Sequence, residues 1–310
     1  MAPWPENMII NERGSPLVSV GLPVYNGERF LARALEALLA QDWSNLDILV
    51  SDNASTDASA TLAESCAARD PRVRVVRSEV NSGFEANFAR VLASARGTYF
   101  MWAGCDDWWD PRFVSRLVAA LERSPSAVVA MSAVERVDEA GALLDVVRHQ
   151  GASDPSSMTS WQLALGLAGG RPYHLFIYGL YRREFISRAF TGFAPVIASD
   201  RLFMCRIAMA GRFAYVDEVL HRRLVRAQPI AERYADEALG RLWHRSWPRW
   251  RLALAAGPYL WHSPVLPASR RAWIPLIVLR FLKASLGQTL VRAVRSPGFA
   301  KIAAGTRRTD

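Results

Sequence analysis

The sequence predicts an α/β protein built on a mostly parallel sheet with helices on both faces. Short apolar segments alternate with segments whose apolar residues recur at helical spacing, and this alternation occurs four times in the first 110 residues. Short loops rich in Asn, Asp, Ser and Gly separate the two kinds of segment. Such alternation is typical of a Rossmann-like sheet with right-handed crossovers.

The elements of the first half can be placed from this periodicity. The apolar run 17–23 is the first predicted strand, and an amphipathic helix follows it. Further strands are predicted at 46–52, 72–78 and 98–103, with helices over 61–70 and 84–95 between them. Asp110-Pro111 predicts the start of another helix, because Pro is favoured at the first helical position.

The second half predicts a mixed rather than a purely parallel arrangement. Its apolar segments differ in length and are joined irregularly, so a simple repeat of strand and helix no longer fits. We expect strands at 126–138 and 141–147, a helix at 159–169, an aromatic strand at 173–183, a helix at 198–211 and a pair of strands within 213–226.

The length of 310 residues suits one large or two modest domains. We predict an α/β domain over residues 1–230 and a basic helical region over 231–310. The three cysteines are odd in number and lack metal-ligand spacing, which favours a reducing, cytosolic setting. The N-terminus does not have the pattern of a signal peptide, and no run of 18 apolar residues predicts a membrane span.

The net charge of +9 is concentrated at one end of the chain. Residues 241–310 contain 13 Lys and Arg but only one acidic residue, Asp310, and this asymmetry indicates a negatively charged partner. Helical spacing places Arg280, Lys283, Arg292 and Arg295 on one side of the last helix, and Leu279, Leu282, Leu286 and Leu290 on the other. Together with nearby Trp residues, this pattern favours an anionic membrane surface over nucleic acid. The alternative is an ordinary amphipathic helix that docks on the α/β domain.

Two adjacent carboxylates, Asp106 and Asp107, directly follow the strand at 98–103. Neighbouring carboxylates repel each other unless a cation lies between them or water surrounds them. Hard divalent cations bound by one or two carboxylates and by substrate phosphates are common at nucleotide sites. The alternative is that Asp106 only caps a helix while Asp107 is a solvated loop residue.

Polar side chains also follow the first two strands, and the carboxyl ends of parallel strands meet at one edge of a sheet. Carboxylates and amides there can bind a ribose and a base, while a cation at Asp106 neutralises a diphosphate. The sequence has neither G-x-G-x-x-G after the first strand nor G-x-x-x-x-G-K-[ST], so dinucleotide oxidoreductases and P-loop NTPases are disfavoured. The converging residues would be Tyr25, Asn26, Glu28, Asp52, Asn53, Asp106 and Asp107. This combination suits a nucleotide-sugar donor.

Several segments, in this order, resemble glycosyltransferase family 2, which has the GT-A fold. They are VSVGLPVYNGERFLARALEALLAQ, LDILVSDNASTD, NSGFEANFARVLASARGTYFMW and DDWWDP, and they cover roughly residues 17–112. The resemblance resumes at GLYRREF and ASDRLFMCRIAMAGRF. It implies a GT-A-like fold, with residues 1–230 as the catalytic domain of a hexosyltransferase-type enzyme.

The resemblance also implies roles for the matching residues. Asp106 would bind Mg²⁺ or Mn²⁺ bridging the donor diphosphate, and Asp107 would support it. Asp200 would be the general base that takes a proton from the acceptor hydroxyl. The nucleotide sugar would be bound by Pro23, Tyr25, Glu28, Asp52, Asn53, Asn81, Asp106 and Asp107.

The sequence departs from the family pattern at three positions. Gly104 stands where many relatives have the first Asp of Asp-x-Asp-Asp, Ser199 where Glu often precedes the base, and Val225 where a His often follows the last strand. Contacts with the leaving diphosphate or the acceptor are therefore assigned to His221, Arg222, Arg223, Arg226, Trp108 and Trp109. For the two tryptophans, packing in the core is the alternative.

The function expected from this resemblance is inverting transfer of a sugar from a UDP- or dTDP-sugar to a glycan or lipid-linked acceptor. The setting would be bacterial surface polysaccharide or glycolipid synthesis at the cytoplasmic face of the cell membrane, with no nucleic-acid partner. Two alternatives stay open. One is a non-catalytic nucleotide-sugar-binding protein of the same fold, and the other is a sugar nucleotidyltransferase, although GLPVYNGERF lacks the Gly/Arg/Lys-rich loop of the latter.

Overall fold

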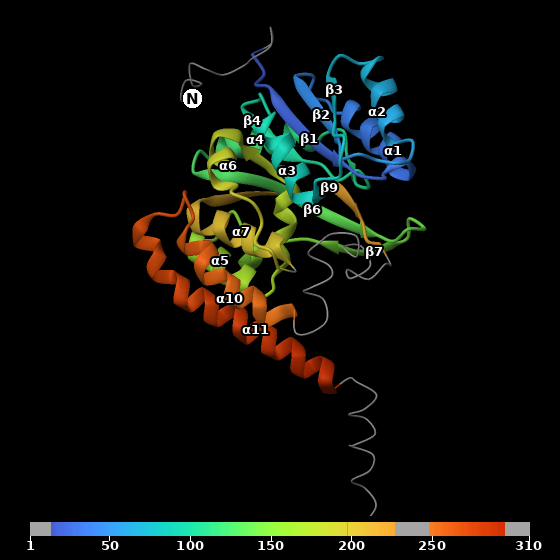
Figure 1. The fold of residues 1–310 in the computed structure, drawn as a ribbon. Helices are drawn as coiled ribbons and strands as arrows, with labels where there is room; N and C mark the ends of the chain where they lie inside the picture. The colour runs from blue at the N-terminus through green and yellow to red at the C-terminus, as the bar shows by residue number, and fades with distance from the viewer. Residues whose placement is uncertain (1–13, 197, 227–247, 295–310) are drawn as a thin grey trace, which may run out of the picture.

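The structure, a computed structural model, describes residues 14–196, 198–226 and 248–294. Its centre is a nine-stranded sheet in the order β3-β2-β1-β4-β8-β6-β9-β5, with β7 paired to β6 (Figure 1). The strands are β1 (Val18–Val24), β2 (Leu46–Asp52), β3 (Val73–Arg77), β4 (Tyr99–Trp102), β5 (Trp108–Trp109), β6 (Ala127–Val137), β7 (Leu143–Val147), β8 (Leu180–Arg182) and β9 (Arg212–Leu224).

The first half forms the predicted parallel sheet. Strand β1 pairs in parallel with both β2 and β4, and β2 pairs in parallel with β3. The connecting helices are α1 (Glu28–Leu39), α2 (Ser59–Ala67) and α3 (Gly83–Ala93). Right-handed crossovers put α1 and α2 on one face and α3 on the other, because the strand order reverses after β3. This arrangement confirms the α/β prediction.

The second half is mixed, as predicted. Strand β8 runs antiparallel to β4 and to β6, whereas β6 and β9 are parallel. The helices here are α4 (Phe113–Arg123), α5 (Ser160–Ala168), α6 (Arg183–Ala189) and α7 (Ser199–Ala210), with short 3₁₀ turns η1 (Gly151–Ser153) and η2 (Pro172–Tyr178).

Three local predictions were wrong. Residues 173–183 do not form one strand, because most of this run forms η2 and only β8 is extended. A buried 3₁₀ helix and a buried strand can both consist of apolar residues, so composition does not distinguish them. Residues 213–226 do not form two strands, because Asp217 and Glu218 lie in a bulge of β9 and not in a turn. Helix α4 begins at Phe113 and not at Pro111.

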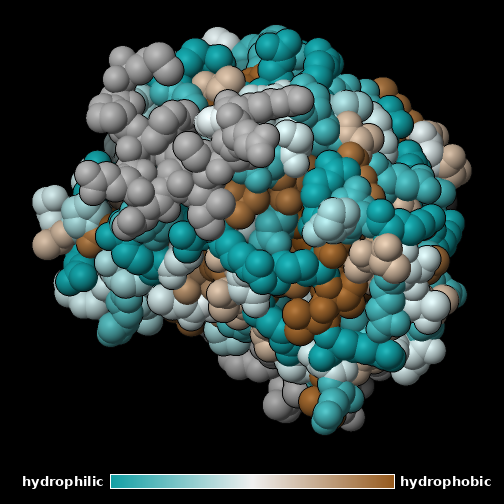
Figure 2. Space-filling view, turned by 90° about the horizontal axis from the view of Figure 1, so that it is seen from above, coloured by the Kyte–Doolittle hydropathy of each residue, from teal (hydrophilic) through white to brown (hydrophobic). Residues whose placement is uncertain are grey.

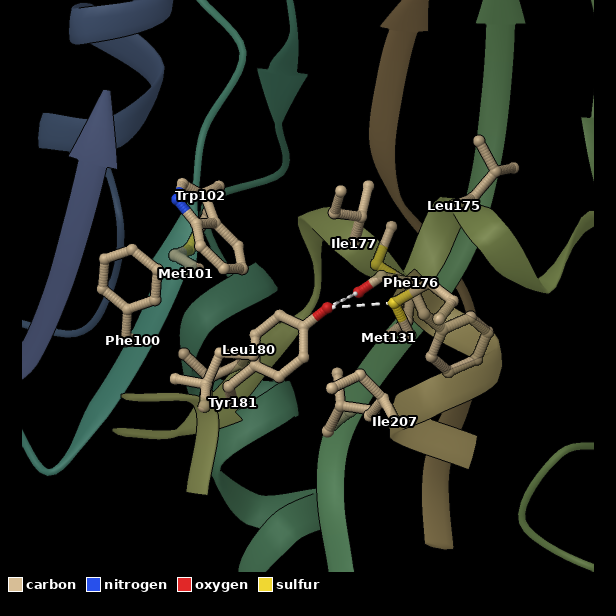
Figure 3. Close-up of a cluster of buried hydrophobic side chains, with 14 of the residues drawn as sticks. Phe100, Met101, Trp102, Met131, Leu175, Phe176, Ile177, Leu180, Tyr181 and Ile207 are labelled. Carbon is tan, nitrogen blue, oxygen red and sulfur yellow. Dashed lines mark hydrogen bonds between the residues drawn. The ribbon is translucent and has the colours of Figure 1, made fainter. Parts of the chain in front are cut away.

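The centre of the core is an aromatic cluster around Trp102 on β4. Its indole is fully buried and contacts the rings of Phe100 and Tyr181. The Tyr181 hydroxyl donates to the carbonyl oxygen of Phe176 at 2.8 Å and also contacts Met204 Sδ at 3.3 Å (Figure 3). Because these residues come from β4, β8, η2 and α7, the cluster fixes the two halves of the sheet to each other.

The C-terminal helices α10 (Pro248–Trp261) and α11 (Ile274–Val294), joined through η3 (Ala268–Trp273), pack against α7 and α5 (Figure 1). Ile274, Ile277 and Phe281 of α11 are buried, whereas Leu276 and Leu279 are more than half exposed. Leu279, one of the four leucines of the predicted aliphatic side, is therefore exposed and does not pack against the rest of the described structure. The predicted domain boundary at residue 230 and the residue Arg295 lie outside the described residues, as do the side chains of Leu286, Leu290 and Arg292.

The face seen from above is mostly hydrophilic, with hydrophobic residues visible across its middle (Figure 2). Among the helices that the structure describes, none has the length and hydropathy needed to span a bilayer.

Gly97, between α3 and β4, gives a test of this packing. A Cβ there would lie 2.5 Å from the carbonyl oxygen of Leu17 and 2.6 Å from the amide nitrogen of Ser19, and backbone atoms cannot rotate away. We expect Gly97→Ala to lower the free energy of unfolding by about 1–3 kcal/mol, measured by urea denaturation. Gly257→Ala is the control, because its new methyl would meet only Val278 Cγ2 at 3.9 Å. Equal stabilities of the two variants would contradict this close packing.

Candidate functional site

The acidic pair lies just beyond the carboxyl end of β4. A Cβ built on Gly104 would lie 2.9 Å from Asp107 Oδ2 and 3.2 Å from Asp106 Oδ1, so one oxygen of each carboxylate faces the same point. Burial and the neighbouring Asp107 raise the pKa of Asp106, against the opposing charge of Arg226. The pair is therefore a concentrated negative charge that requires cationic partners.

Strand β9 and the residues after it supply these partners. Arg226 donates from Nε and Nη2 to Oδ2 of Asp106, at 3.0 and 2.9 Å. His221 Nε2 lies 3.1 Å from Oδ2 of Asp107, and the His221 ring stacks on Trp109, with 5.7 Å between ring centroids. Asp107 and His221 are almost completely buried, so this second pair is fixed in the interior.

Arg223 connects the acidic pair with Asp200. Burial alone would lower the pKa of Arg223, but the nearby Tyr178 and the carboxylates of Asp107, Asp200 and Asp106 raise it, so the guanidinium stays charged. Its Cζ lies 5.1 Å from the centroid of the Tyr178 ring. Asp106, Asp107 and Asp200 are therefore all near enough to Arg223 to affect its pKa.

Asp200 lies in the first turn of α7, after Ala198, whose φ of 61° is unusual for a residue with a side chain. The carboxylate accepts a hydrogen bond from the Arg201 amide at 2.8 Å. His174 of η2 lies near Asp200, and burial lowers the pKa of its imidazole to about 4. Its Nδ1 is buried and has no hydrogen-bond partner among the described residues.

A second part of the site lies at the ends of β2 and β3. The Asp52 carboxylate is buried, and its Oδ2 lies 3.5 Å from Nε of Arg77. Oδ1 of Asp52 has no hydrogen-bond partner in the described part of the chain. The hollow beside it is lined by Ala54, Ser55, Arg77, Ser78 and Glu79. Asp52 is thus a buried carboxylate with one oxygen unpaired among the described residues, next to Arg77, which lines the hollow.

The loop after β2 is fixed to two neighbouring loops. Asn53 Nδ2 donates to Asn81 Oδ1 at 2.7 Å, and Asn53 Oδ1 accepts from Ser82.

The Glu28 carboxylate accepts from the amide of Ala58 at 2.9 Å. Pro23 pairs with Ser51 in the β1–β2 register, and Tyr25 has 45% of its surface exposed. These predicted residues therefore share one edge of the sheet with Asp52.

The tryptophans and Arg222 occupy different environments. Trp109 is fully buried, as the core alternative predicted for at least one of the two. Trp108 is half-buried, with the Arg222 guanidinium 5.3 Å from its ring centroid, and Arg222 also forms an ion pair with Glu135. Since successive strand residues face opposite sides, Arg222 points away from the side that carries His221.

The residues at the acidic pair fit a hard divalent cation. Oδ1 of Asp106 and Oδ2 of Asp107 converge beside Gly104, and carboxylate oxygens completed by substrate phosphates suit Mg²⁺ or Mn²⁺. Within the described ranges, no cluster of three or more His, Cys, Asp or Glu side chains could bind a metal by itself. The remaining ligands would therefore be phosphate oxygens and water.

Sequence reasoning did not assign His174, Tyr178, Arg77 or Arg201 to the site. His174 and Tyr178 lie on η2, and the misassignment of this segment as a strand hid their position. Arg77 ends β3 opposite Asp52, and this strand register could have indicated it. For Arg201, the sequence offered no indication of a place in the site other than its position next to Asp200.

Comparison with known families defines the class. The family profile described as Glycosyl transferase family 2 matches residues 19–171. The chain belongs to this family. It is 36% identical over 121 residues to the uncharacterized protein Rv1520 of Mycobacterium tuberculosis, covering 38% of this chain and 35% of the relative. It is 26% identical over 226 residues to the putative glycosyltransferase EpsH of Bacillus subtilis, covering 71% and 64% of the two chains. The chain thus spans only about a third of the length of the first of these relatives.

Solved structures share the fold. The crystal structure of S. aureus TarS 1-349 in complex with UDP-GlcNAc superposes with a TM-score of 0.62 at 17% identity, over 87% of this chain and 73% of that one. The mannosyltransferase PcManGT from Pyrobaculum calidifontis, in complex with GDP-Man and Mn²⁺, gives a TM-score of 0.55 at 19% identity, over 98% and 83%. These similarities confirm the GT-A-like fold.

His174 gives a pH test of the site. Burial lowers its pKa from 6.5 to about 4, so between these values the unfolded chain binds more protons and the folded state loses stability as the pH falls. When the pH falls from 7 to 5, the free energy of unfolding should decrease in the parent. We expect this decrease to be about 2 kcal/mol smaller in His174→Gln, measured by urea denaturation. The control is His262→Gln at an exposed position, whose free energy of unfolding should decrease by as much as that of the parent. Identical losses in all three proteins would contradict a buried, neutral His174.

Proposed function

We propose that this chain is an inverting glycosyltransferase that transfers a sugar from a nucleoside-diphosphate sugar to a hydroxyl of a glycan or lipid-linked acceptor. The observation that supports this most is that carboxylate oxygens of Asp106 and Asp107 face one point beside Gly104, with Asp200 near the same guanidinium, that of Arg223. It joins a diphosphate-binding acidic pair to a carboxylate able to accept a proton. Residues 1–230 would form the catalytic domain. Synthesis of bacterial surface polysaccharide is the proposed setting, supported by the relative WcaA of Escherichia coli, which is described as a putative colanic acid biosynthesis glycosyl transferase.

In the proposed reaction, Asp200 accepts the proton of the acceptor hydroxyl. The oxygen of that hydroxyl attacks the anomeric carbon from the side opposite the diphosphate, and the bond from this carbon to the diphosphate breaks. Arg223 offers positive charge between Asp200 and the acidic pair, where charge develops on the leaving group. Neutral His174 next to Asp200 adds no competing positive charge. Asp106 and Asp107 would hold the divalent cation, which supplies Lewis-acid stabilisation of the leaving diphosphate.

The proposed donor is a UDP- or dTDP-sugar. The Asp52 carboxylate would accept a base N–H, and Arg77, which lines the adjacent hollow, would donate to a neighbouring carbonyl oxygen. The imide edge of uracil or thymine presents this combination. Bound UDP-GlcNAc in TarS supports a uridine donor, whereas bound GDP-Man in PcManGT supports a guanosine donor as the competing choice.

The test is Asp200→Asn assayed with UDP-, dTDP- and GDP-sugars. Loss of general-base catalysis should lower turnover by about 10²–10⁴-fold, while donor binding measured by thermal shift stays nearly unchanged. The control is Asp42→Asn, which changes an exposed carboxylate bonded to Ser115 and should retain parental turnover. Unchanged turnover in Asp200→Asn would exclude Asp200 as the base. Binding of a donor without any turnover in the parent would favour the non-catalytic alternative.

We also propose that the C-terminal helices bind an anionic membrane surface at the inner face of the cell membrane. Helical spacing puts Leu276, Leu279, Arg280 and Lys283 of α11 within an arc of about 100°, and all four are exposed. Ile277 and Phe281, on the other side of α11, are buried, whereas the exposed Arg280 also reaches Gly169 at the end of α5. Exposed leucines flanked by cations suit the headgroup region of an anionic leaflet.

This membrane proposal predicts binding to vesicles containing phosphatidylglycerol. Each basic residue near such a surface contributes about 1 kcal/mol, so the double variant Arg280→Gln/Lys283→Gln should reduce partitioning by roughly 10- to 30-fold in co-sedimentation. The control is Arg123→Gln/Arg188→Gln, which removes two exposed cations from α4 and α6. Equal losses in both variants would indicate nonspecific charge attraction, and no binding by the parent would exclude the proposal.

A further inference from the structure

The two carboxylates of the acidic pair have partners of different kinds. The partner of Asp107 is His221, which has 0% of its side chain exposed and stacks on Trp109. The partner of Asp106 is Arg226, which has 31% of its side chain exposed. One partner is therefore enclosed in the core, whereas the other lies where solvent reaches it.

The contact between Arg226 and Asp106 has a particular geometry. Both Nε and Nη2 of the guanidinium contact the same oxygen, Oδ2, and do not form a fork across the two carboxylate oxygens. The other oxygen, Oδ1, faces Gly104 together with Oδ2 of Asp107. The Arg226 guanidinium also lies 5.4 Å from the centroid of the Phe30 ring, which offers it a second contact away from the carboxylate.

We infer that Arg226 is an internal counter-ion of Asp106 that competes with the divalent cation for this carboxylate, and so sets the cation affinity of the site. With Gly104 in place of a third carboxylate, Asp106 and Asp107 are the residues of the described ranges whose acidic oxygens face this point. The Arg226 guanidinium neutralises the negative charge of Asp106 that would otherwise attract the divalent cation. A cation that binds here loses attraction to Asp106 or displaces Arg226, and either effect weakens its binding.

The inference rests on the cation site of the proposed function but makes a separate prediction. A charge-assisted hydrogen-bonded pair is worth more than a neutral one, so its loss should be visible in the cation affinity. A displaced Arg226 would lie beside the position proposed for the donor diphosphate. The arginine would then exchange one anionic partner for another when the donor and the cation bind together.

The experiment measures Mn²⁺ binding to the full chain without any nucleotide, by the loss of the electron paramagnetic resonance signal of free Mn²⁺. We expect Arg226→Met to bind Mn²⁺ about tenfold more tightly than the parent, since charged hydrogen bonds are worth at least that factor. Arg226→Lys keeps the charge but not the two-nitrogen contact, and we expect an intermediate affinity. Thermal denaturation checks that each variant is folded at the assay temperature.

Two controls isolate the effect. Arg222→Met also removes an arginine of β9 from a carboxylate, Glu135, but this ion pair lies on the other side of the strand. We expect it to leave Mn²⁺ affinity within about twofold of the parent, because the charge removed is screened from the acidic pair by distance. Adding Asp106→Asn to Arg226→Met should abolish the gain, since the contested carboxylate is then absent.

The outcomes separate this inference from the proposed function. Equal Mn²⁺ affinities in the parent, Arg226→Met and Arg226→Lys would overturn the competition, whatever the protein catalyses. Equal gains in Arg226→Met and Arg222→Met would overturn it as well, because they would report only the net charge. Tighter binding in Arg226→Met alone supports the inference even if the chain transfers no sugar, since no donor enters the measurement.

Discussion

The placement of two adjacent carboxylates at the buried end of β4 constrains the structure around them. Burying one unpaired carboxylate is costly, and burying two neighbouring ones is more so. Strand β9 and the residues just after it meet this constraint along one short stretch. His221 contacts Asp107, Arg226 contacts Asp106, and Arg223 is near enough to the acidic pair and Asp200 for their charges to raise its pKa. The pairing of β9 with both β6 and β5 fixes this register.

The aromatic core below the site determines how rigidly these charges are held. Trp102 ends β4, immediately before the loop that carries the acidic pair, and it is packed against Tyr181 of β8 and Phe203 of α7. Asp200 lies on the same helix as Phe203. Any movement of Asp200 relative to the acidic pair would therefore disturb a closely packed cluster, and such clusters resist small displacements.

The strained backbone positions lie close to the predicted functional residues. Asn26 and Ala54 have φ values of 49° and 61°, and each is the second residue after its strand, β1 or β2. Ala198, with φ of 61°, precedes Asp200. Left-handed conformations of residues with side chains are uncommon and tend to be found at functional sites. Here they turn the chain sharply, so that polar residues at the ends of neighbouring elements face one edge of the sheet.

The sequence by itself determined the parallel half of the sheet and the loops that carry Asp52, Asp106 and Asp200. Local periodicity and the polar residues after each strand are enough for this, because a βα unit is built from contacts between neighbours in sequence. It did not determine that residues 173–178 form η2, since a buried apolar run has no period of its own. It also took the bulge at Asp217 and Glu218 for a turn, because both place polar residues inside an apolar segment.

Only the tertiary structure decided which charges meet. Asp106 and Arg226 are 120 residues apart, and Asp107 and His221 are 114 residues apart. His174 gave no signal in the sequence, and its position near Asp200 follows from the packing of η2 against α7. Such pairs depend on strand register and helix packing between distant segments, and no local pattern encodes the identity of a partner that far away.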